Sequence, residues 1–458
     1  MSLQQLLGAI VGARHVLTAP EDTQPHFSDW RRQYAAAAEC VVRPANTEEV
    51  AAVVALCQRE RVAIVPQGGN TGLVGGSVPT GSRREIVLAL GRMNRIREVD
   101  ALNDTITVEA GCVLAAVQAA AEQAGRLFAL SLAAEGSCQI GGNLATNAGG
   151  VNVLRYGTAR EQVLGLEVVL PDGRVWNGLR ALRKDNTGYD LKQLFLGSEG
   201  TLGIITAAVL RLFPRPTASL TAWIGLPSAQ AAVELLALLR SRLGDRISAF
   251  ELVSRSALEA VLAHLPATRD PLPAAHPWYV LAELADNGKP AALHSAVERT
   301  LEHAAQSGTL ADAALAQNAE QARALWRLRE SIPEAQFSNV KHDISVPVSA
   351  LPGFVERAGA ALQARFGRVP VYCFGHVGDG NLHYNVGSPA LLARRAEVSR
   401  LVYDLVGQLG GSISAEHGLG QLKRDEIRRH KGAVEMELMQ TLKRALDPKG
   451  LMNPGKVL

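Results

Sequence analysis

The fold is decided by a glycine-rich stretch, PQGGNTGLVGGSVP, at residues 66–79. Its five glycines and two prolines do not suit a regular helix or strand, so we expect a loop. Upstream, the pattern predicts a strand at 40–42, a helix from 47 to about 59 with Asn46 as its N-cap, and a second strand at 62–65. The first part of the chain is therefore a β-α-β unit that ends in a long glycine loop.

A second tract rich in glycine and asparagine, EGSCQIGGNLATNAGG, covers residues 135–150. Around it, short β-rich runs alternate with turns up to about residue 215, and Asp172-Gly173 marks a hairpin between two of them. Glycine lets backbone N–H groups approach an anion without a clash from a Cβ, so the two tracts can hold a pyrophosphate. Two long surface loops are the alternative. Neither G-x-G-x-x-G nor G-x-x-x-x-G-K-[ST] occurs, which disfavours a Rossmann nicotinamide site and a P-loop.

Length and composition indicate a folded chain of roughly two to four domains. Of the 458 residues 47% are hydrophobic and 20% charged, which excludes a disordered chain and a coiled coil. The net charge is +3 and the basic residues form no run, so we expect small-molecule partners and no nucleic acid. No apolar run reaches the roughly 18 residues of a membrane span. Five cysteines without a C-x-x-C pair, and no basic signal-peptide region, favour reduced thiols and a cytoplasmic location.

The character of the sequence changes at FPRP, residues 213–216. Beyond it the pattern predicts strands at 220–226, 247–253 and 278–284 and helices at 228–243 and 257–264. This alternation indicates an antiparallel sheet covered by helices on one face. The predicted fold class is α+β, with a first domain at 1–215, a second at 216–410 and a C-terminal segment at 411–458.

The segment VYCFGHVGDGNLHYNV, residues 371–386, places polar side chains in a predicted hairpin. The Asp-Gly pair at 379–380 suits a two-residue type I′ turn, and with that turn His376 pairs directly with His383. Directly opposed residues have Cβ atoms about 5 Å apart, so both imidazoles can bind one metal ion. Asn385 follows His383 by two residues and therefore shares its face of the strand.

Two further segments supply candidate site residues. In GGSISAEHGLGQLKRDE, Glu416 can complete a site of two histidines and one carboxylate, with His417 as a base beside the ion. An exposed turn is the alternative for this pair. In WRLRESIPEAQFSNVKHDISVP, Arg329 and Lys341 lie close to the strand-like DISVP, and ordinary exposed basic residues are an equal alternative.

Taken together, these motifs resemble those of the vanillyl-alcohol oxidase flavoprotein superfamily over nearly the whole chain. PQGGNTGLVGGSVP is similar to the family's FAD pyrophosphate loop, and GGNLATNAGG with LGSEGTLGIIT is similar to its second FAD-contacting region. GHVGDGNLH, SAEHGLG and DPKGLMNPGKVL are typical of its branch of FAD-dependent D-2-hydroxy acid dehydrogenases. The resemblance implies a PCMH-type FAD-binding domain of two α+β subdomains, a cap domain, and a segment from residue 411 that returns to the FAD domain.

The resemblance also implies the cofactor-binding residues. They are Pro66, Gly68, Gly69, Asn70, Thr71, Gly72, Gly76, Ser77, Gly136, Ser137, Gly141, Gly142, Asn143, Ala145, Thr146, Gly150, Glu199, Gly200, Gly203, Ile205 and Asn453. The first loop has no histidine, so FAD is expected to be bound non-covalently. By position, the resemblance implies His376, His383 and Glu416 as ligands of zinc or manganese, and His417 as the catalytic base.

The implied substrate follows from Arg329 and Lys341, which the resemblance assigns to substrate carboxylates, with Asn385 as a further lining residue. Because family members that act on monocarboxylates tend to lack the lysine, the resemblance implies a dicarboxylate, D-2-hydroxyglutarate. The implied reaction gives 2-oxoglutarate, with the hydroxyl and carboxylate on the metal and hydride transfer to flavin N5. Pro333 stands where some such enzymes carry a hydroxyl residue, which removes the donor of one substrate hydrogen bond.

Other interpretations stay open at this point. D-lactate, D-malate or glycolate is the alternative substrate within the same branch. A metallohydrolase that uses His376, His383 and Glu416, with merely structural glycine loops, would be colourless. A non-catalytic flavin-binding subunit is a third interpretation. The expected electron acceptor is an electron-transfer flavoprotein or a quinone-linked carrier, and a homodimer is compatible with the sequence.

Overall fold

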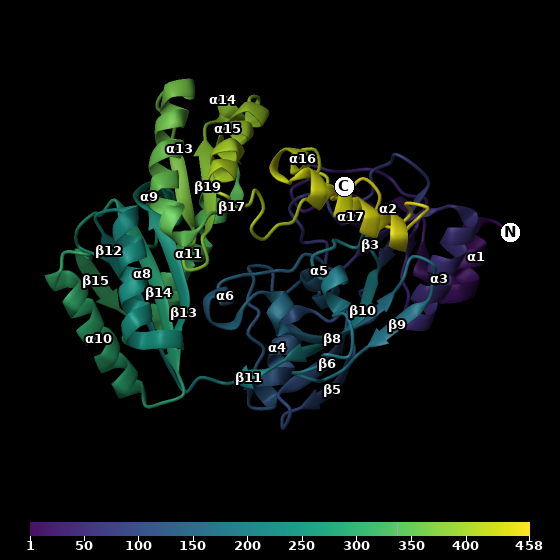
Figure 1. Cartoon of the computed structure of the whole chain (residues 1–458), viewed down its shortest axis with the longest axis horizontal. Helices are drawn as coiled ribbons and strands as arrows, with labels where there is room; N and C mark the ends of the chain where they lie inside the picture. The colour runs from purple at the N-terminus through teal and green to yellow at the C-terminus, as the bar shows by residue number, and fades with distance from the viewer. Residues whose placement is uncertain (337) are drawn as a thin grey trace. The chain divides into compact units, whose positions relative to one another are not determined.

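The protein is described by a computed structural model that covers residues 1–336 and 338–458. It divides into two compact units, and Figure 1 labels many of their helices and strands. Unit 1 consists of Met1–Gly149, Thr158–Arg215 and Glu416–Leu458, and unit 2 consists of Gly150–Gly157 and Pro216–Ala415. After a short first visit at Gly150–Gly157, the chain enters unit 2 again at Pro216, where the sequence changes character, and it returns to unit 1 at Glu416.

The first sheet of unit 1 has four strands in the order β1-β2-β4-β3, with β2, β4 and β3 parallel. Its elements are α1 (Leu3–Val11), β1 (Val16–Leu17), α2 (Pro20–Phe27), β2 (Val41–Val42), α3 (Thr47–Glu60), β3 (Ala63–Gln67) and β4 (Glu85–Ala89). The side chain of Asn46 accepts a hydrogen bond from the backbone N–H of Glu49 (2.8 Å), as predicted for the N-cap of α3. Since β3 leads directly into the first glycine tract, the buried core under this sheet fixes where the tract begins.

The second sheet of unit 1 has the order β5-β6-β10-β8-β9, and its pairs are antiparallel. The elements of this part are β5 (Ile96–Asp100), β6 (Thr105–Glu109), α4 (Leu114–Gln123), β7 (Arg126–Leu127), α5 (Ile140–Ala145), β8 (Val163–Val169), β9 (Val175–Gly178), α7 (Lys192–Phe195), β10 (Ile204–Arg211) and β11 (Phe213–Pro214). The predicted hairpin at Asp172-Gly173 joins β8 to β9, and Gly173 has a φ of 87°. The second glycine tract lies between β7 and β8, so both tracts belong to unit 1 up to Gly149.

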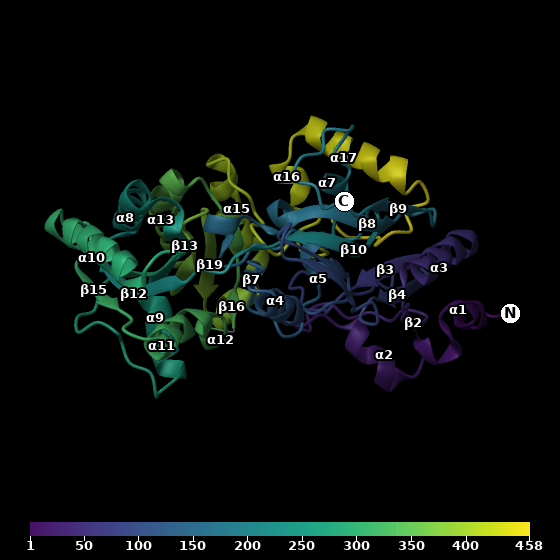
Figure 2. The ribbon, with the colours of Figure 1, turned by 90° about the horizontal axis from the view of Figure 1, so that it is seen from below.

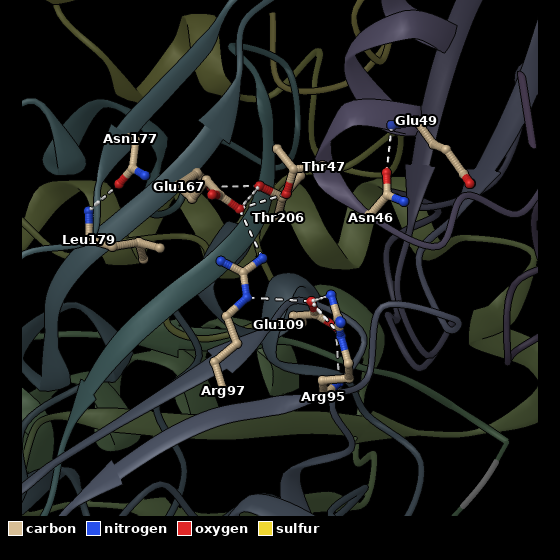
Figure 3. Close-up of polar contacts among 10 residues, drawn as sticks. All are labelled: Asn46, Thr47, Glu49, Arg95, Arg97, Glu109, Glu167, Asn177, Leu179 and Thr206. Carbon is tan, nitrogen blue, oxygen red and sulfur yellow. Dashed lines mark hydrogen bonds and ion pairs between the residues drawn. The ribbon is translucent and has the colours of Figure 1, made fainter.

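A buried polar network connects the two sheets of unit 1 (Figure 3). The Glu167 carboxylate on β8 accepts hydrogen bonds from the hydroxyls of Thr47 (2.6 Å), in α3, and Thr206 (3.0 Å), on β10. Arg97 bridges the carboxylates of Glu167 and Glu109, with N–O distances of 3.2 and 3.4 Å. Burial alone would raise the pKa of the Glu167 carboxyl, but hydrogen bonds from Thr47 and Arg97 hold it below its ordinary value. The helix of the first sheet is thereby fixed to the second.

The C-terminal part of unit 1 extends the first sheet. After α16 (Ile427–His430) and α17 (Ala433–Leu446), the chain runs along the edge strand β3. The backbone N–H of Ile64 donates to the carbonyl of Leu451, and the N–H of Asn453 donates to the carbonyl of Ile64, both at 2.8 Å. These bonds pair an edge that the first sheet would otherwise expose.

Unit 2 is built on one antiparallel sheet in the order β15-β12-β14-β13-β18-β19-β16, with β17 paired to β19. Its strands are β12 (Ala218–Leu226), β13 (Ile247–Ser254), β14 (Trp278–Asp286), β15 (Asp312–Leu315), β16 (Asn339–Val340), β17 (Asp343–Ser345), β18 (Val371–His376) and β19 (Asn381–Gly387). The three strands predicted from the sequence correspond to β12, β13 and β14. The inserted helix α6 (Val153–Tyr156) contacts β13.

Helices cover both faces of this sheet, whereas the sequence pattern predicted helices on one face only (Figure 2). One face packs against α8 (Ala229–Leu243), α10 (Pro290–Gln306), α13 (Leu351–Phe366) and α15 (Arg395–Gln408). The other face packs against α9 (Arg255–His264), α11 (Ala319–Glu330) and α12 (Ile332–Ala335). The prediction of a single covered face was wrong because the pattern of a helix such as α11, which buries Leu325 and Leu328, does not determine which face of the sheet that helix packs against. Phe374 of β18, which lies two residues before His376, belongs to this second core.

Among the described residues, no helix combines the length and the apolar character that crossing a bilayer requires. The five cysteines are buried free thiols. Burial raises the pKa of Cys40 and of Cys57 to about 12, so these thiols stay protonated at neutral pH.

Candidate active site

The glycine tracts of unit 1 line a cleft that holds about 930 Å³ of empty space, its open mouth included. Most of the predicted FAD-binding residues lie in its wall. They are Pro66, Gly68, Gly69, Asn70, Thr71, Gly72, Gly76, Ser77, Gly141, Gly142, Asn143, Ala145, Thr146, Glu199, Gly200, Gly203 and Ile205.

Glycine is required where the two tracts pack against each other. A Cβ built on Gly69 would lie 2.1 Å from the carbonyl oxygen of Ser137, far inside the 3.4 Å at which ordinary contact begins. By contrast, a Cβ on Gly72 or Gly142 meets no atom within 4 Å. Gly69 is therefore needed for the close contact between the two tracts, whereas Gly72 and Gly142 lie beside open space.

Two amide oxygens in this wall are suited to a bound ligand. Gln139 Oε1 and Asn143 Oδ1 are buried and have no hydrogen-bond partner among the described residues. A buried acceptor without a donor costs about 1–3 kcal/mol, so this pair favours a ligand with N–H or O–H groups. FAD carries such donors on its ring system and its sugar moieties, and the residues present therefore fit it.

His417 lies in the wall of the same cleft, and Glu199 holds its segment in place. The Glu199 carboxylate accepts hydrogen bonds from the backbone N–H groups of Leu419 (2.7 Å) and Gly420 (2.8 Å). Burial raises the pKa of this carboxyl, and the two backbone donors oppose the rise. Glu199 thus fixes the loop that begins two residues after His417.

In unit 2 the hairpin of β18 and β19 carries His376 and His383, but its turn is longer than predicted. The observed register pairs Phe374 with His383, so His376 is not directly opposite His383, and the two-residue turn was wrong. The physical reason is that the backbone of Gly380 bonds to Val346, which extends the turn to residues 377–380. The two imidazoles still share one face of the sheet, with ring centroids 6.1 Å apart.

A buried glutamate on the neighbouring strand contacts both a histidine and an arginine of the predicted site. Glu251, on β13, lies opposite His376 and has no exposed surface. Its Oε1 lies 2.5 Å from His376 Nδ1, and its Oε2 accepts a hydrogen bond from Arg329 Nε at 2.8 Å. Burial alone would raise the pKa of the Glu251 carboxyl, but His376 and Arg329 hold it below its ordinary value. The Arg329 guanidinium also lies over the ring of Phe374, 4.9 Å from its centroid.

The other predicted substrate residues lie in the same unit. Lys341 Nζ donates to the carbonyl of Pro333 (3.2 Å), so the lysine is next to the proline that replaces a hydroxyl residue. Asn385 is buried, and its amide bonds to the backbone N–H of His342 (3.1 Å) and to the side chain of Gln336 (3.1 Å). Its amide is therefore engaged inside the sheet.

Comparison with known proteins identifies the family. Residues 38–178 match the family described as FAD binding domain, and residues 215–457 match the family described as FAD linked oxidases, C-terminal domain. The chain belongs to the FAD-linked oxidases. This confirms the resemblance and the expectation of an FAD-dependent oxidoreductase.

Full-length relatives and solved structures agree with this family. The D-2-hydroxyglutarate dehydrogenase of Xanthomonas citri pv. viticola is 40% identical, over 100% of this chain and 96% of the relative. The mitochondrial D-2-hydroxyglutarate dehydrogenase of Bos taurus is 42% identical, over 97% of this chain and 81% of the relative. A solved p-cresol methylhydroxylase with substrate bound has a TM-score of 0.78 at 19% identity, and the match covers 99% of this chain and 96% of that one. The structural likeness confirms the predicted α+β fold class.

Four residues of the predicted FAD set are not in the cleft wall of this FAD-linked oxidase: Gly136, Ser137, Gly150 and Asn453. Ser137 supports the wall through its carbonyl, which packs on Gly69. Asn453 Nδ2 donates to the carbonyls of Gly76 (2.9 Å) and Glu199 (2.7 Å) and so connects two wall loops. Gly150 belongs to unit 2.

Sequence reasoning missed several residues of the FAD-linked oxidase that the structure brings to these sites. In the cleft wall they are Val74, Leu90, Gln139, Ser198 and Ile204. All of these except Leu90 lie within the quoted motifs, so their position in the motif was a usable signal. In unit 2, Asp343 pairs with His383, and its Oδ1 lies 4.0 Å from His383 Nδ1. Glu251 gave no signal because it is 125 residues away from His376.

Glu416 and His417 are the first residues of the C-terminal part of unit 1, directly after Ala415 of unit 2. Just upstream, Ser412 exchanges backbone hydrogen bonds of 2.8 and 2.9 Å with Ser345, the last residue of β17. The role of Glu416 as a metal ligand of this FAD-linked oxidase stays a prediction.

Proposed function

We propose that this FAD-linked oxidase oxidises D-2-hydroxyglutarate to 2-oxoglutarate with FAD and a divalent metal ion. The observation that carries the proposal is a pair of histidines on one sheet face, His376 and His383, together with the buried Arg329 of α11, which Glu251 connects to His376. This arrangement occurs in a chain that is 40% and 42% identical to two proteins named D-2-hydroxyglutarate dehydrogenase.

The donor set of unit 2 fits zinc or manganese. Since His376 Nδ1 faces a carboxylate, its Nε2 keeps the lone pair that a metal requires. His383 offers a second imidazole, and we assign the third position to Glu416, four residues after the anchored Ser412. Two imidazoles and one carboxylate leave positions open for a substrate hydroxyl and carboxylate. The metal, when bound, supplies the positive charge that lowers the pKa of that hydroxyl.

Arg329 and Lys341 account for the preference for a diacid. Because Nε of Arg329 is bonded to Glu251, its two terminal nitrogens can form a fork with one substrate carboxylate. Lys341 provides a point charge for the other carboxylate. A monocarboxylate such as D-lactate would use only one of these two cations.

His417 acts as the base that removes the proton of the substrate C2 hydroxyl, a role that suits an imidazole with a pKa near neutrality. Its place in the wall of the FAD cleft supports this role. FAD, when bound without a covalent link, supplies the acceptor for the hydride from C2. Glu199 keeps His417 oriented through the backbone of the following loop.

The electron acceptor and the compartment belong to the same proposal. We propose an electron-transfer flavoprotein or a quinone-linked carrier as the acceptor and the cytoplasm as the location. D-lactate is the second candidate substrate, because a putative D-lactate dehydrogenase of Schizosaccharomyces pombe is 38% identical over 98% of this chain and 87% of its own length.

An anaerobic titration of the purified, zinc-replete protein tests the proposal. We expect D-2-hydroxyglutarate to bleach the visible flavin absorption band, and D-lactate and the L-acid to bleach it much less. Protein treated with a chelator should not respond to the D-acid until zinc or manganese is restored. Stronger bleaching by D-lactate would reject the diacid, and a colourless protein that takes up no FAD would reject the proposed chemistry altogether.

A further inference from the structure

We propose that Glu251 is a positioning residue that couples the metal-binding histidine His376 to the substrate-binding arginine Arg329. The inference rests on the proposed function for the roles of these two partners. The contacts themselves are features of unit 2 alone, so they can be tested separately from turnover.

The geometry gives each oxygen of Glu251 its own partner. Oε1 faces His376 Nδ1 at 2.5 Å, and Oε2 accepts from Arg329 Nε at 2.8 Å. The three residues come from β13, β18 and α11, and the pairing of β13 with β18 places Glu251 directly opposite His376. Phe374, two residues before His376 on β18, lies against the Arg329 guanidinium. One carboxylate therefore sets the orientation of both partners.

The contact with His376 determines which ring nitrogen is available. A carboxylate at Nδ1 favours the tautomer with the proton on Nδ1, which leaves the lone pair on Nε2. Partners of this kind behind a metal-binding histidine typically change metal affinity by about 10- to 100-fold when they are removed. The contact with Arg329 fixes the orientation of the guanidinium group. Because Nε donates to Glu251, the two terminal nitrogens are left to bind a carboxylate.

A second carboxylate in the same sheet, Glu283, has only structural partners and serves as a comparison for Glu251. Glu283, on β14, accepts hydrogen bonds from the Trp326 indole N–H (2.8 Å) and the Ser248 hydroxyl (3.3 Å), both neutral donors. Each carboxylate accepts two contacts, but only Glu251 contacts a histidine and an arginine.

The decisive variant is Glu251→Gln, with Glu283→Gln as its matched control. An amide has one acceptor oxygen, so Gln at position 251 cannot accept from both His376 and Arg329. Gln at 283 can accept from the Trp326 indole with its oxygen and donate its NH₂ to the Ser248 hydroxyl, which also donates to the backbone carbonyl of residue 283. We expect the zinc dissociation constant, measured by competition with a chromogenic chelator, to rise about 10- to 100-fold for E251Q and to change less than about threefold for E283Q. At saturating zinc, KM for D-2-hydroxyglutarate should rise more than kcat falls in E251Q, because the arginine is misaligned before the chemical step.

The folded wild-type protein provides a second test, which does not depend on the stability of E251Q. In metal-free protein with ¹⁵N-labelled histidine, the His376 signals, assigned with His376→Gln, should show the proton on Nδ1. A proton on Nε2, or equal zinc affinity in wild type and folded E251Q, would overturn the inference alone. If the wild type binds neither zinc nor manganese, the proposed function fails, and the coupling to a metal fails with it.

Discussion

The contact between the two glycine tracts leads to a sharp prediction for Gly69→Ala. The added Cβ would lie 2.1 Å from the Ser137 carbonyl oxygen and 3.0 Å from the Cα of Cys138, so backbone must move by more than an ångström to restore normal contact. Overpacking of this kind costs about 1–3 kcal/mol. For a unit of this size each kcal/mol lowers Tm by about 2–4 °C, so we expect the apoprotein of G69A to melt about 2–12 °C below wild type.

The matched control is Gly72→Ala in the same tract. Its Cβ meets no atom within 4 Å, so the apoprotein should melt at the wild-type temperature. The measurement is thermal unfolding of flavin-free protein followed by far-UV circular dichroism, together with the FAD content of the purified protein. G69A should also retain less FAD, since the displaced backbone is part of the cleft wall. Equal melting temperatures for wild type and G69A, or an equal loss in G72A, would refute the argument that the tracts pack against each other.

Three further predictions address the catalytic residues and the pH dependence of stability. Lys341→Ala should lower kcat/KM for D-2-hydroxyglutarate by about 10- to 100-fold, because a hydrogen bond to a charged group contributes about 1.5–3 kcal/mol. The kcat/KM for D-lactate should be nearly unchanged. An equal loss for both acids in steady-state assays would remove the role of the lysine. His417→Gln should lower kcat by about 10²- to 10⁴-fold while the FAD content is retained, because only proton removal is lost; a wild-type kcat would assign the base elsewhere. Lys456 is buried without a hydrogen-bond partner for Nζ among the described residues, and burial lowers its pKa to about 8. Below about pH 8 its ammonium is charged in both folded and unfolded chains and destabilises the fold by about 3 kcal/mol, and this cost fades as pH rises toward the unfolded pKa of about 10.4. Lys456→Met should therefore raise Tm at pH 7 and lose most of this advantage by pH 10; an advantage of the same size at both values would contradict the buried-charge argument.

The sequence predicted those parts of the fold and site that depend on local patterns. The N-cap Asn46, the hairpin at Asp172-Gly173 and the strands β12 to β14 follow from turn chemistry and short-range periodicity. Alternation along the strands also placed His376 and His383 on one face of the sheet. This prediction is correct although the turn is longer than expected, because the register differs by two residues and side chains two residues apart point to the same face.

What the sequence could not predict depends on distant pairing. The turn of the β18–β19 hairpin is longer than two residues, and the backbone N–H of Val346 donates to the carbonyl of Gly380 in it. The local sequence around Asp379-Gly380 does not indicate this contact. Glu251 reaches His376 only because β13 pairs with β18 across more than a hundred residues. The second covered face has the same cause, since the helical pattern of α11, which buries Leu325, Leu328 and Arg329, does not determine which face of the sheet the helix covers.

The backbone bonds that join β3 to residues 451–453 can form only at the end of synthesis of the chain, so the first sheet is completed last. A ribosome delivers β3 and the first glycine tract early, yet this edge strand stays without its partner until all of unit 2 has emerged. Chains grow at about 5–20 residues per second, so the unpaired edge is exposed for tens of seconds, long enough for contact with chaperones or with other nascent chains. A premature stop between residue 415 and residue 451 would therefore leave unit 2 complete but unit 1 with an open sheet edge, and such a product should be degraded faster than the full chain.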